Sequence, residues 1–549
     1  MTALTNHASV LLIAIPLLGA FAVPLLGKLG RGTRNTFVGL IALITAAFAG
    51  LLAASVFGRA GAPGLYVLGG GGFGIPLPTG LTVPIRIILE IDGMSAFMAL
   101  ITALVTLTGA FFSFSYWKDR SGGTLFYSLL LLLTAGIFGM ELTGDMFNFF
   151  VFLEITSIAA CGLIGFRVWL RNSQEAGFKV MALYTLSGLF VLLAVGLLYG
   201  QYGGLNIAYL ASALTGSAID LVALGLLLTG LALKAGAVPL HMWAPDAYGE
   251  APAPMSAVLV ANSQASLYGL FRILFTLFGL TISVAALGWI LIVLALLTIF
   301  VGVTMALIQS DIKRLIAYGA VSQIGYMLLG VGVGLTVSVA KPDYGFVAMQ
   351  GGIFHMFNDA ACVGLAVSVA KPDYGFIAMQ GGIFHMLNDA ACIGLLFFVS
   401  GVIIRATGTR DLNRMGGLAH SMKWTSVLFM IGAFALAGVP PFNGFASKFL
   451  IYEAAFKLSP FLSVIAILSS ILLLAVFVKV FQAAFLGPKP EGLSSEVPMG
   501  MMVPMVALAL VVVVFGLFPG FFVDKIVTPA ANALWYGRDA YIGLVLGGG

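Results

Sequence analysis

The chain has 549 residues, of which 60% are hydrophobic and only 9% are charged, with a net charge of +5 at pH 7. This composition excludes a water-soluble domain, because apolar runs of 18 or more residues are long enough to span a bilayer. It does not indicate nucleic-acid binding, since the basic residues are scattered over short loops. The sequence therefore predicts an integral membrane protein.

Fourteen apolar runs are long enough to be membrane-spanning helices. They lie near residues 9–27, 36–57, 94–116, 124–140, 146–167, 178–199, 218–238, 252–277, 283–308, 315–336, 376–403, 424–454 (broken), 461–486 and 501–522. The first run has no basic segment before it, so we expect it to remain as a span rather than to be cleaved as a signal peptide. The three cysteines lack metal-ligand spacing and are interpreted as packing residues, and we expect no metal or cofactor.

Lysine and arginine gather in alternate short loops, a pattern typical of loops that stay on the cytoplasmic side. These basic residues are Lys28, Arg31, Arg34, Lys118, Arg120, Arg167, Arg171, Lys179, Lys313, Arg314, Arg405, Arg410, Arg414 and Lys423. We therefore expect a multi-pass protein of the cell membrane with both termini outside.

The fifth predicted span, TGDMFNFFVFLEITSIAACGLIGF, puts Glu154 well inside the membrane. A carboxyl group at that depth is either paired with a cation or protonated. Lys234, in the seventh predicted span, is the candidate partner. The alternative is a neutral glutamic acid with a structural role.

The seventh span and its continuation read LALKAGAVPLHMWAPDAYGE, with Lys234 inside the apolar run and Pro239 and His241 after it. Proline removes a backbone donor and breaks the helix. A charged side chain at mid-bilayer costs about 3 kcal/mol on insertion scales. A broken helix beside a buried lysine indicates a route for a proton or a small cation. The alternative is a lysine that extends to the membrane interface.

The twelfth span, FALAGVPPFNGFASKFL, repeats this combination with Pro440, Pro441 and Lys448. Two broken helices in corresponding positions of two halves indicate an inverted-repeat transporter. Burial lowers the pKa of a lysine, so both lysines are candidates for proton exchange near neutral pH.

A histidine and an amide lie between the two lysines in the sequence. His385, or its duplicate His355, is a candidate relay because histidine titrates near physiological pH, and the alternative is a hydrogen-bonded packing histidine. Gln264 can hold a water chain but carries no proton of its own. Asp389 is expected to pair locally with a histidine or to line a helix end rather than to bind a metal.

A tandem repeat of 30 residues disturbs this regular arrangement. Segments 334–363 and 364–393 differ at four positions, and each contains AKPDYGF, AMQGGIFHM and NDAAC. If the first copy were a complete extra span, the loop from Arg405 to Lys423 would lie outside, against the charge pattern. The repeat is either a recent duplication held as a loop or hairpin, or an error in the recorded sequence, and we favour the error.

The chain resembles the antiporter-like membrane subunits shared by respiratory complex I, membrane-bound hydrogenases and Mrp-type cation/proton antiporters. The stretches that carry the resemblance are TGDMFNFFVFLEI, LKAGAVPLHMWAPDAYGEAPAPMSAVL, LIQSDIKRLIAYGAVSQIGYMLLG, GTRDLNRMGGL and GVPPFNGFASKF. The stretch TGDMFNFFVFLE most resembles the corresponding sequence of the Mrp D subunit and its hydrogenase relative.

The resemblance implies an all-α polytopic membrane protein of about 14 transmembrane helices. It implies three N-terminal helices (1–120), a five-helix unit (121–280), an inverted second unit (281–487) that contains the repeat, and a last helix with a tail (488–549). It further implies that Glu154 and Lys234 form the ion pair of the first unit, that Lys448 is the terminal lysine of the second unit, and that His385 belongs to the relay between them.

This chain departs from the family at two positions. Relatives often carry a lysine four residues before Tyr268, where Gln264 stands here, and another lysine in the eleventh helix. These departures put a continuous lysine relay in doubt.

Two functions follow from the residues and the resemblance. The first is a subunit that translocates protons, with exchange for Na⁺ left open, beside homologous antiporter-like subunits of a multisubunit complex. The second is a scaffold subunit that kept the fold but lost conduction. We expect no catalytic redox site in this chain, and whether the complex is an oxidoreductase or an antiporter stays open.

Overall fold

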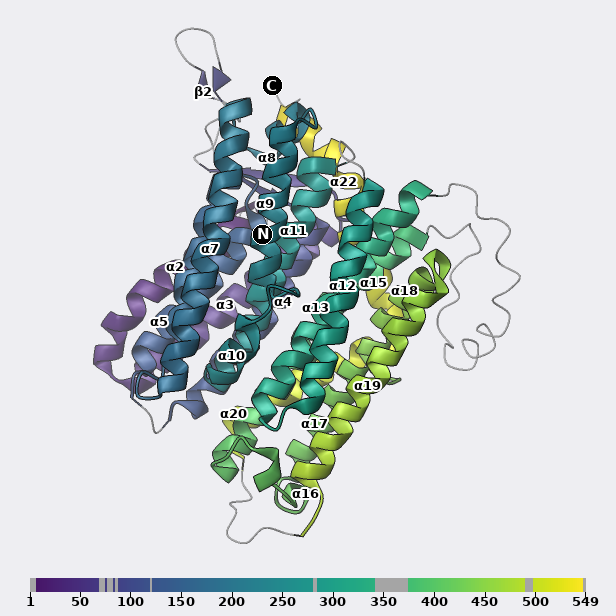
Figure 1. The fold of residues 1–549 in the computed structure, drawn as a ribbon. Coiled ribbons are helices and arrows are strands. Elements are labelled where there is room, and N and C mark those ends of the chain that lie inside the picture. Colours follow the sequence, from purple (N-terminus) through teal and green to yellow (C-terminus); the bar gives the residue numbers. More distant parts are fainter. Residues whose placement is uncertain are drawn as a thin grey trace.

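The computed structural model describes residues 6–68, 75–76, 82–83, 87–118, 121–279, 284–340, 374–488 and 497–546. Within these ranges the chain forms an elongated bundle of helices that run up and down between two ends (Figure 1). Thirteen described helices are long and apolar enough to cross a membrane. The remaining predicted span, near 424–454, is divided between two shorter helices.

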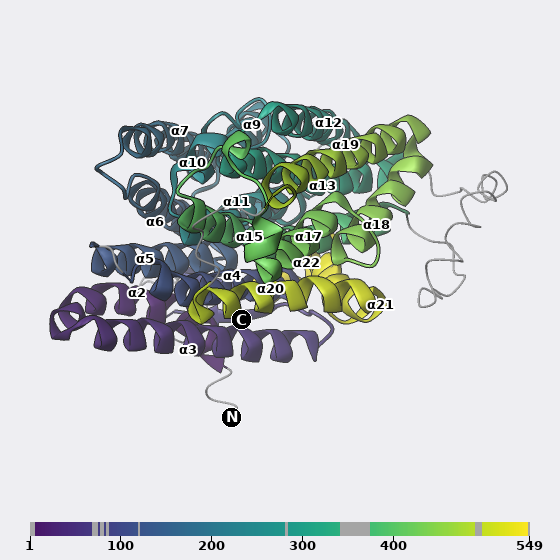
Figure 2. The ribbon, with the colours of Figure 1, turned by 90° about the horizontal axis from the view of Figure 1, so that it is seen from below.

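The first three long helices pack beside the rest of the bundle, where Figure 2 shows two of them at one edge. They are α2 (Ala8–Leu26), α3 (Arg31–Phe57) and α4 (Gly93–Tyr116). The segment between α3 and α4, which joins the second and third predicted spans, contains two antiparallel strand pairs, which the all-α prediction omitted. They are β1 (Gly64–Val67) with β4 (Ile88–Ile91), and β2 (Ile75–Pro76) with β3 (Thr82–Val83).

The helices within 121–280 alternate in direction. They are α5 (Gly123–Leu142), α6 (Met146–Ile164), α7 (Arg171–Tyr202), the short α8 (Ile207–Ala213), α9 (Ala218–Ala235), α10 (Trp243–Glu250), α11 (Ala253–Arg272) and the π-helical turn η2 (Ile273–Phe278). Here α9 and α10 are the two parts of the seventh predicted span. Every residue of α11 is buried, because α4, α9 and α15 pack around it.

The helices within 281–487 form the second half of the bundle. They are α12 (Val284–Ile308), α13 (Ile312–Ala340), α15 (Tyr374–Thr407), η4 (Leu412–Arg414), α16 (Leu418–Ser421), α17 (Lys423–Ala437), α18 (Asn443–Leu458) and α19 (Pro460–Phe485). The two halves run in opposite directions, since α5 starts at the end that carries Lys118, whereas α12 finishes at that end near Lys313.

Two helices from the two halves meet in the middle of the bundle. Figure 2 shows α11 and α15 surrounded by other helices, and the two pack directly against each other. α15 also packs against α13, α17 and α18. Side chains on α11 and α15 therefore connect the two broken helices.

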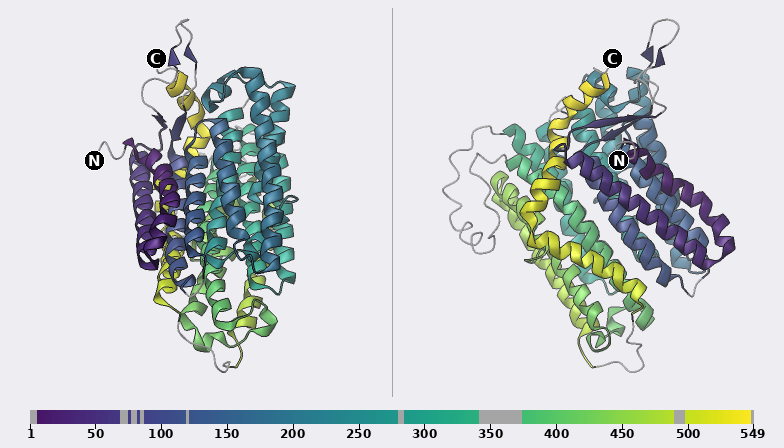
Figure 3. Two further views of the ribbon diagram at one scale, coloured as in Figure 1. Left: turned by 90° about the vertical axis from the view of Figure 1, so that its left-hand side faces the viewer. Right: turned by 180° about the vertical axis from the view of Figure 1, so that it is seen from behind.

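The C-terminal region folds into more helix than the predicted last span and tail. After α20 (Met499–Leu517) come α21 (Pro519–Phe522), η5 (Val523–Val527) and α22 (Thr528–Leu546). α22 packs against α4, α8 and α15, and its end lies near the strands (Figure 3). The first repeat copy lies outside the described residues from 341 onward, as does His355, whereas the second copy forms the start of α15 from Tyr374.

Candidate functional site

The two broken helices use the same short motif. α9 ends at Gly236 and α17 ends at Gly438, both with positive φ (91° and 80°), which glycine adopts without strain. Proline follows within three residues in each case, so neither helix continues directly. The sequence correctly predicted both breaks from these prolines.

Lys234, at the end of α9, is completely buried. Its ammonium group donates to the carbonyl oxygen of Leu153, to Thr156 Oγ1 at 2.8 Å and to Ser157 Oγ at 2.7 Å. It also lies 5.0 Å from the centre of the Tyr184 ring. Three acceptors match the three N–H groups of an ammonium ion, so a cation is held here by neutral oxygens alone.

Glu154 does not contact Lys234 directly. Within the described residues Glu154 takes part in no ion pair, and its buried Oε1 has no hydrogen-bond partner. It lines a groove of about 670 Å³ between α5, α6 and α7, and Ser157 lines the same groove. Because Ser157 also accepts a hydrogen bond from Lys234, it bridges the groove and the lysine. The expected ion pair is thus not a direct contact. Lys234 contacts Ser157 instead, and Glu154 lines the groove nearby.

Lys448, on α18, is also completely buried. It donates to the carbonyl oxygen of Leu436 at 2.8 Å and to Ser470 Oγ at 3.0 Å, and it lies 4.2 Å from the centre of the Tyr326 ring. Leu436 belongs to the last turn of α17, where carbonyl groups lack helical partners and favour a cation. Like Lys234, Lys448 makes no ion pair within the described residues.

His385 lies between Gln323 and Ser447 and is completely buried. Its Nε2 donates to Gln323 Oε1 at 3.0 Å, because an amide oxygen can only accept, and its Nδ1 is hydrogen-bonded to Ser447 at 2.9 Å. Ser447 directly precedes Lys448 in the chain. The structure therefore puts His385 beside the second broken helix, and sequence reasoning did not identify its two partners.

Gln264 joins α11 to α15. Its Nε2 donates to the carbonyl oxygen of Met386 at 2.8 Å and to Asp389 Oδ2 at 3.0 Å. The prediction that Asp389 pairs with a histidine or lines a helix end was wrong, because its described partner is this amide in the middle of the bundle.

Several buried polar atoms on the helices of this region have no hydrogen-bond partner in the part of the chain that the structure describes. They are Asn262 Oδ1, Gln264 Oε1, Asn388 Oδ1, Asp389 Oδ1 and Asn443 Nδ2. Buried polar groups normally find a hydrogen-bond partner, from the protein or from ordered water. Such atoms on α11, α15 and the start of α18, the helices between the two lysines, fit internal water molecules.

His241 is the remaining predicted site residue. It lies half-buried in the turn between α9 and α10, and its ring centre is 6.5 Å from that of Tyr318. Its Nδ1 has no partner among the described residues. The described contacts do not join it to either lysine.

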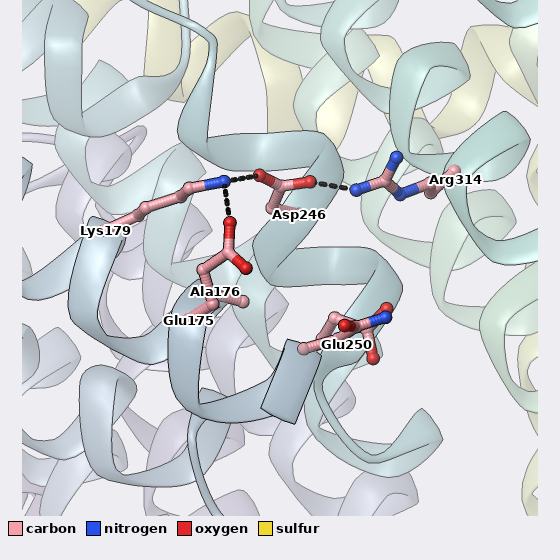
Figure 4. Close-up of a pocket in the computed structure, with 7 residues that line it drawn as sticks. Glu175, Ala176, Lys179, Asp246, Glu250 and Arg314 are labelled. Atoms are coloured by element: carbon pink, nitrogen blue, oxygen red, sulfur yellow. Dashed lines mark hydrogen bonds and ion pairs between the residues drawn. The ribbon is translucent and has the colours of Figure 1, made fainter. Parts of the chain in front are cut away.

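Ion pairs fix the end of α10 where the basic loops gather. Asp246 contacts Lys179 at 3.1 Å and also Arg314, around a pocket of about 140 Å³ that Glu175 and Glu250 line too (Figure 4). Arg410 reaches Glu250 at 2.9 Å. These carboxylates were visible in the sequence, but their partners come from distant helices.

A second charged cluster lies at the opposite end of α11 and was missed. Arg272 contacts Glu90 at 3.0 Å and Asp92 at 2.5 Å, and all three side chains are buried. The signal was an arginine at the end of the eighth apolar run. Across the described residues, no group of three His, Cys, Asp or Glu side chains could hold a metal ion.

Comparisons with known proteins connect this geometry to a family. The family described as NADH:quinone oxidoreductase/Mrp antiporter, transmembrane region, matches residues 143–373 and 361–474, so the match divides inside the tandem repeat. The N subunit of the NADH-quinone oxidoreductase of Desulforudis audaxviator is 32% identical over 94% of this chain and 96% of its own length. The D subunit of the Na⁺/H⁺ antiporter of Bacillus subtilis is 30% identical over 93% and 94%.

The fold has a counterpart among solved structures. A chain of the membrane-bound sulfane sulfur reductase, an archaeal respiratory membrane complex, superposes with a TM-score of 0.81 at 28% identity. The superposition covers 98% of this chain and 100% of that one. With two broken helices, two buried lysines and matches over nearly its whole length, the chain belongs to the NADH:quinone oxidoreductase/Mrp antiporter membrane-subunit family.

Proposed function

We propose that this chain translocates protons across the membrane as one subunit of a multisubunit energy-converting complex. The observation that carries the proposal is the setting of Lys234 and Lys448, which are completely buried and, among the described residues, contact only neutral oxygens and aromatic rings. A permanent charge without a counter-ion is expensive inside a membrane. Release of the proton removes this cost, because the lysine becomes a neutral amine. Each lysine can therefore act as a proton carrier.

The side chains between the two lysines support lateral proton movement. Gln264 joins α11 to α15, and His385 joins α15 through Ser447 to the start of α18. Amides and hydroxyls organise water, whereas histidine can accept and release a proton. Protons would therefore move between the lysines through this buried polar layer.

Glu154 and His241 take different parts in this proposal. Glu154 lines the groove that also reaches Ser157, so it connects Lys234 to the outer surface of α6 and α7. Its negative charge would favour the protonated form of Lys234. His241 is half-buried near the ion pairs of α10, where it would pass protons between that end of the bundle and the break after α9.

Relatives support the setting within a complex. They include a subunit of an NADH-quinone oxidoreductase and a subunit of a Na⁺/H⁺ antiporter, at nearly the same identity. We propose that this chain likewise assembles with other membrane subunits, including antiporter-like ones, in the cell membrane with both termini outside. Exchange of protons for Na⁺ is the variant that the antiporter relative supports.

Proton flux in proteoliposomes that contain the whole complex tests the proposal. Lys234→Ala and Lys448→Ala should each lower flux at least ~100-fold, the lower end of the range for loss of a positioned proton-transfer group, while the complex still assembles. A scaffold subunit would show unchanged flux in both variants. Recording Na⁺ movement in parallel distinguishes proton pumping from exchange.

A further inference from the structure

Asp389 is a buried carboxyl group in the junction between the two halves of the bundle. It lies on α15, is 2% exposed, and accepts from Gln264 Nε2 through Oδ2 at 3.0 Å. Its other oxygen, Oδ1, has no protein partner, and Asp389 makes no ion pair within the described residues. A permanently ionised carboxylate is costly in such a site unless a cation neutralises it.

The neighbours of Asp389 lead to the second broken helix. Asn388, the preceding residue, donates to the carbonyl oxygen of Asn443 at 2.9 Å, where α18 begins. One turn earlier on α15, His385 is hydrogen-bonded through Nδ1 to Ser447 Oγ at 2.9 Å, and Ser447 directly precedes Lys448. The carboxyl group therefore stands between Gln264 on α11 and the lysine on α18.

The side of Asp389 that faces α11 is polar but not charged. Among the described residues, Gln264 Oε1 on that helix and Asn388 Oδ1 on α15 are buried without a hydrogen-bond partner. Acceptors of this kind are satisfied by water, which donates to them and can link them to the free Oδ1 of Asp389. Proton transfer needs such a continuous set of hydrogen-bonded groups.

We infer that Asp389 is a proton-carrying residue that connects the two halves, with Gln264 as its positioning residue. A proton that arrives through water binds Oδ1 of the carboxylate and leaves a neutral carboxylic acid. That acid then releases the proton toward the neutral amine of Lys448, which becomes an ammonium ion, and the carboxylate is restored. Gln264 holds Oδ2 throughout this cycle. The inference rests on the proposed function and adds a residue to it.

A purely structural role makes a different prediction. If Asp389 served only to anchor α11 to α15, asparagine would serve as well, because its amide oxygen can also accept from Gln264 Nε2. Asparagine cannot carry a proton at accessible pH. The exchange of carboxyl for amide at nearly constant shape therefore separates the two roles.

The experiment compares proton flux of Asp389→Asn with wild type in proteoliposomes containing the whole complex. Flux should fall at least ~tenfold in Asp389→Asn, and Asp389→Glu should recover part of it. The matched control is Glu141→Gln on α5, an equally buried carboxyl group that accepts from the Thr102 hydroxyl at 2.6 Å. Wild-type flux in Asp389→Asn would overturn the inference.

A second measurement does not depend on flux. Infrared spectra recorded across a pH series should contain a carboxylic-acid C=O band that grows as the pH falls and is absent in Asp389→Asn. If Lys448→Ala stops transport but Asp389→Asn retains both flux and that band, the proposed function survives and the role of Asp389 does not. If Lys448→Ala also retains wild-type flux, the proposed function itself fails.

Gln264→Lys tests the inference by adding a titratable group beside Asp389 instead of removing one. An ammonium group 3 Å or so from Asp389 Oδ2 would form a direct ion pair and hold the carboxyl group in its charged form. Flux should then fall, although a proton carrier has been added. Faster flux than wild type would mean that a lysine, and not the Asp389 carboxyl group, is the better carrier at this junction, against the inference.

Discussion

The bundle contains two kinds of buried cation, which differ in the groups that surround them. At the C-terminal end of α11, Arg272 contacts Glu90 and Asp92 and also donates through Nε to the Tyr268 hydroxyl at 2.8 Å. Lys234, on the neighbouring α9, and Lys448 contact only neutral groups. Among the described residues, Arg272 thus contacts two carboxyl groups, whereas the two lysines contact none.

This difference separates a permanent charge with a structural role from a charge that can be lost by proton release. Arginine keeps its proton at any accessible pH and its planar group suits two carboxylates at once. Lysine releases a proton when burial without a counter-ion makes the charge costly. Arg272 therefore joins the strand β4 and the start of α4 to α11, while the two lysines remain free to change charge.

The first prediction removes the paired cation. Arg272→Met leaves the buried Glu90 and Asp92 without their partner, which typically costs 3–5 kcal/mol for a buried pair. We expect little assembled protein, measured by membrane yield and by the midpoint of thermal unfolding in detergent. Lys234→Met should unfold close to wild type, because no carboxylate depends on it.

The control for this prediction removes the whole cluster. Adding Glu90→Gln and Asp92→Asn to Arg272→Met eliminates the stranded charges and should restore much of the yield. Equal loss of stability in Arg272→Met and Lys234→Met would contradict the distinction between the two kinds of cation.

The second prediction keeps the charge of Lys448 but removes its ability to exchange a proton. Lys448→Arg should lower proton flux ~100-fold, within the range of a lost proton-transfer group, while assembly stays intact. Flux is measured in proteoliposomes beside Lys448→Ala. Wild-type flux in the arginine variant would mean that Lys448 supplies only a fixed positive charge.

The third prediction concerns the pH dependence of the paired cluster. One guanidinium group faces two carboxylates, and Asp92 also accepts from the backbone of Ser95 at the start of α4. Burial raises the pKa of Glu90 from 4.5 to about 8, with Asp92 raising it further and Arg272 opposing the shift. The folded state therefore holds a proton that the unfolded chain has released between these two values.

This extra bound proton determines how the stability of the folded state changes with pH. A raised pKa stabilises the folded state fully below about pH 4.5, and that contribution is lost as the pH rises to about 8. Relative to Glu90→Gln, wild type should lose at most about 1.4 kcal/mol per pH unit over this interval. Unfolding midpoints of both proteins between pH 5 and pH 8 check this, and parallel curves would contradict it.

Sequence reasoning found the spans, both breaks and both buried lysines, because each depends on local features. Apolar runs define the helices, and proline with a left-handed glycine ends α9 and α17. The α15 contacts of Gln264 could not be found in this way, because its neighbours come from a helix more than a hundred residues later. The same holds for Glu90 and Arg272, which a strand and a helix bring together.

The predicted Glu154–Lys234 ion pair shows a finer limit of sequence reasoning. The apolar runs put both residues within long helices, but they could not tell which residue of α6 the ammonium group would reach. The structure brings Thr156 and Ser157 to Lys234 and leaves Glu154 at the groove. A shift of about one turn along α6 therefore decides whether the ammonium group meets a carboxylate or a hydroxyl group.

The last prediction concerns the space around Glu154. Gly188 on α7 faces this carboxyl group so closely that an added Cβ would overlap Oε1, and the Glu154 side chain would have to move. Gly196, on the same helix, has no atom within 4 Å of the corresponding position, so Gly196→Ala is the matched control.

We expect Gly188→Ala to lower proton flux roughly threefold to tenfold, a smaller loss than that from removing a carrier, because the carboxyl group is displaced but kept. Helix propensity favours alanine at both positions, so the fold should be slightly stabilised in each variant. Flux of the two variants is compared in proteoliposomes that contain the whole complex. Equal flux in Gly188→Ala and Gly196→Ala would mean that the position of the Glu154 carboxyl group does not limit transport.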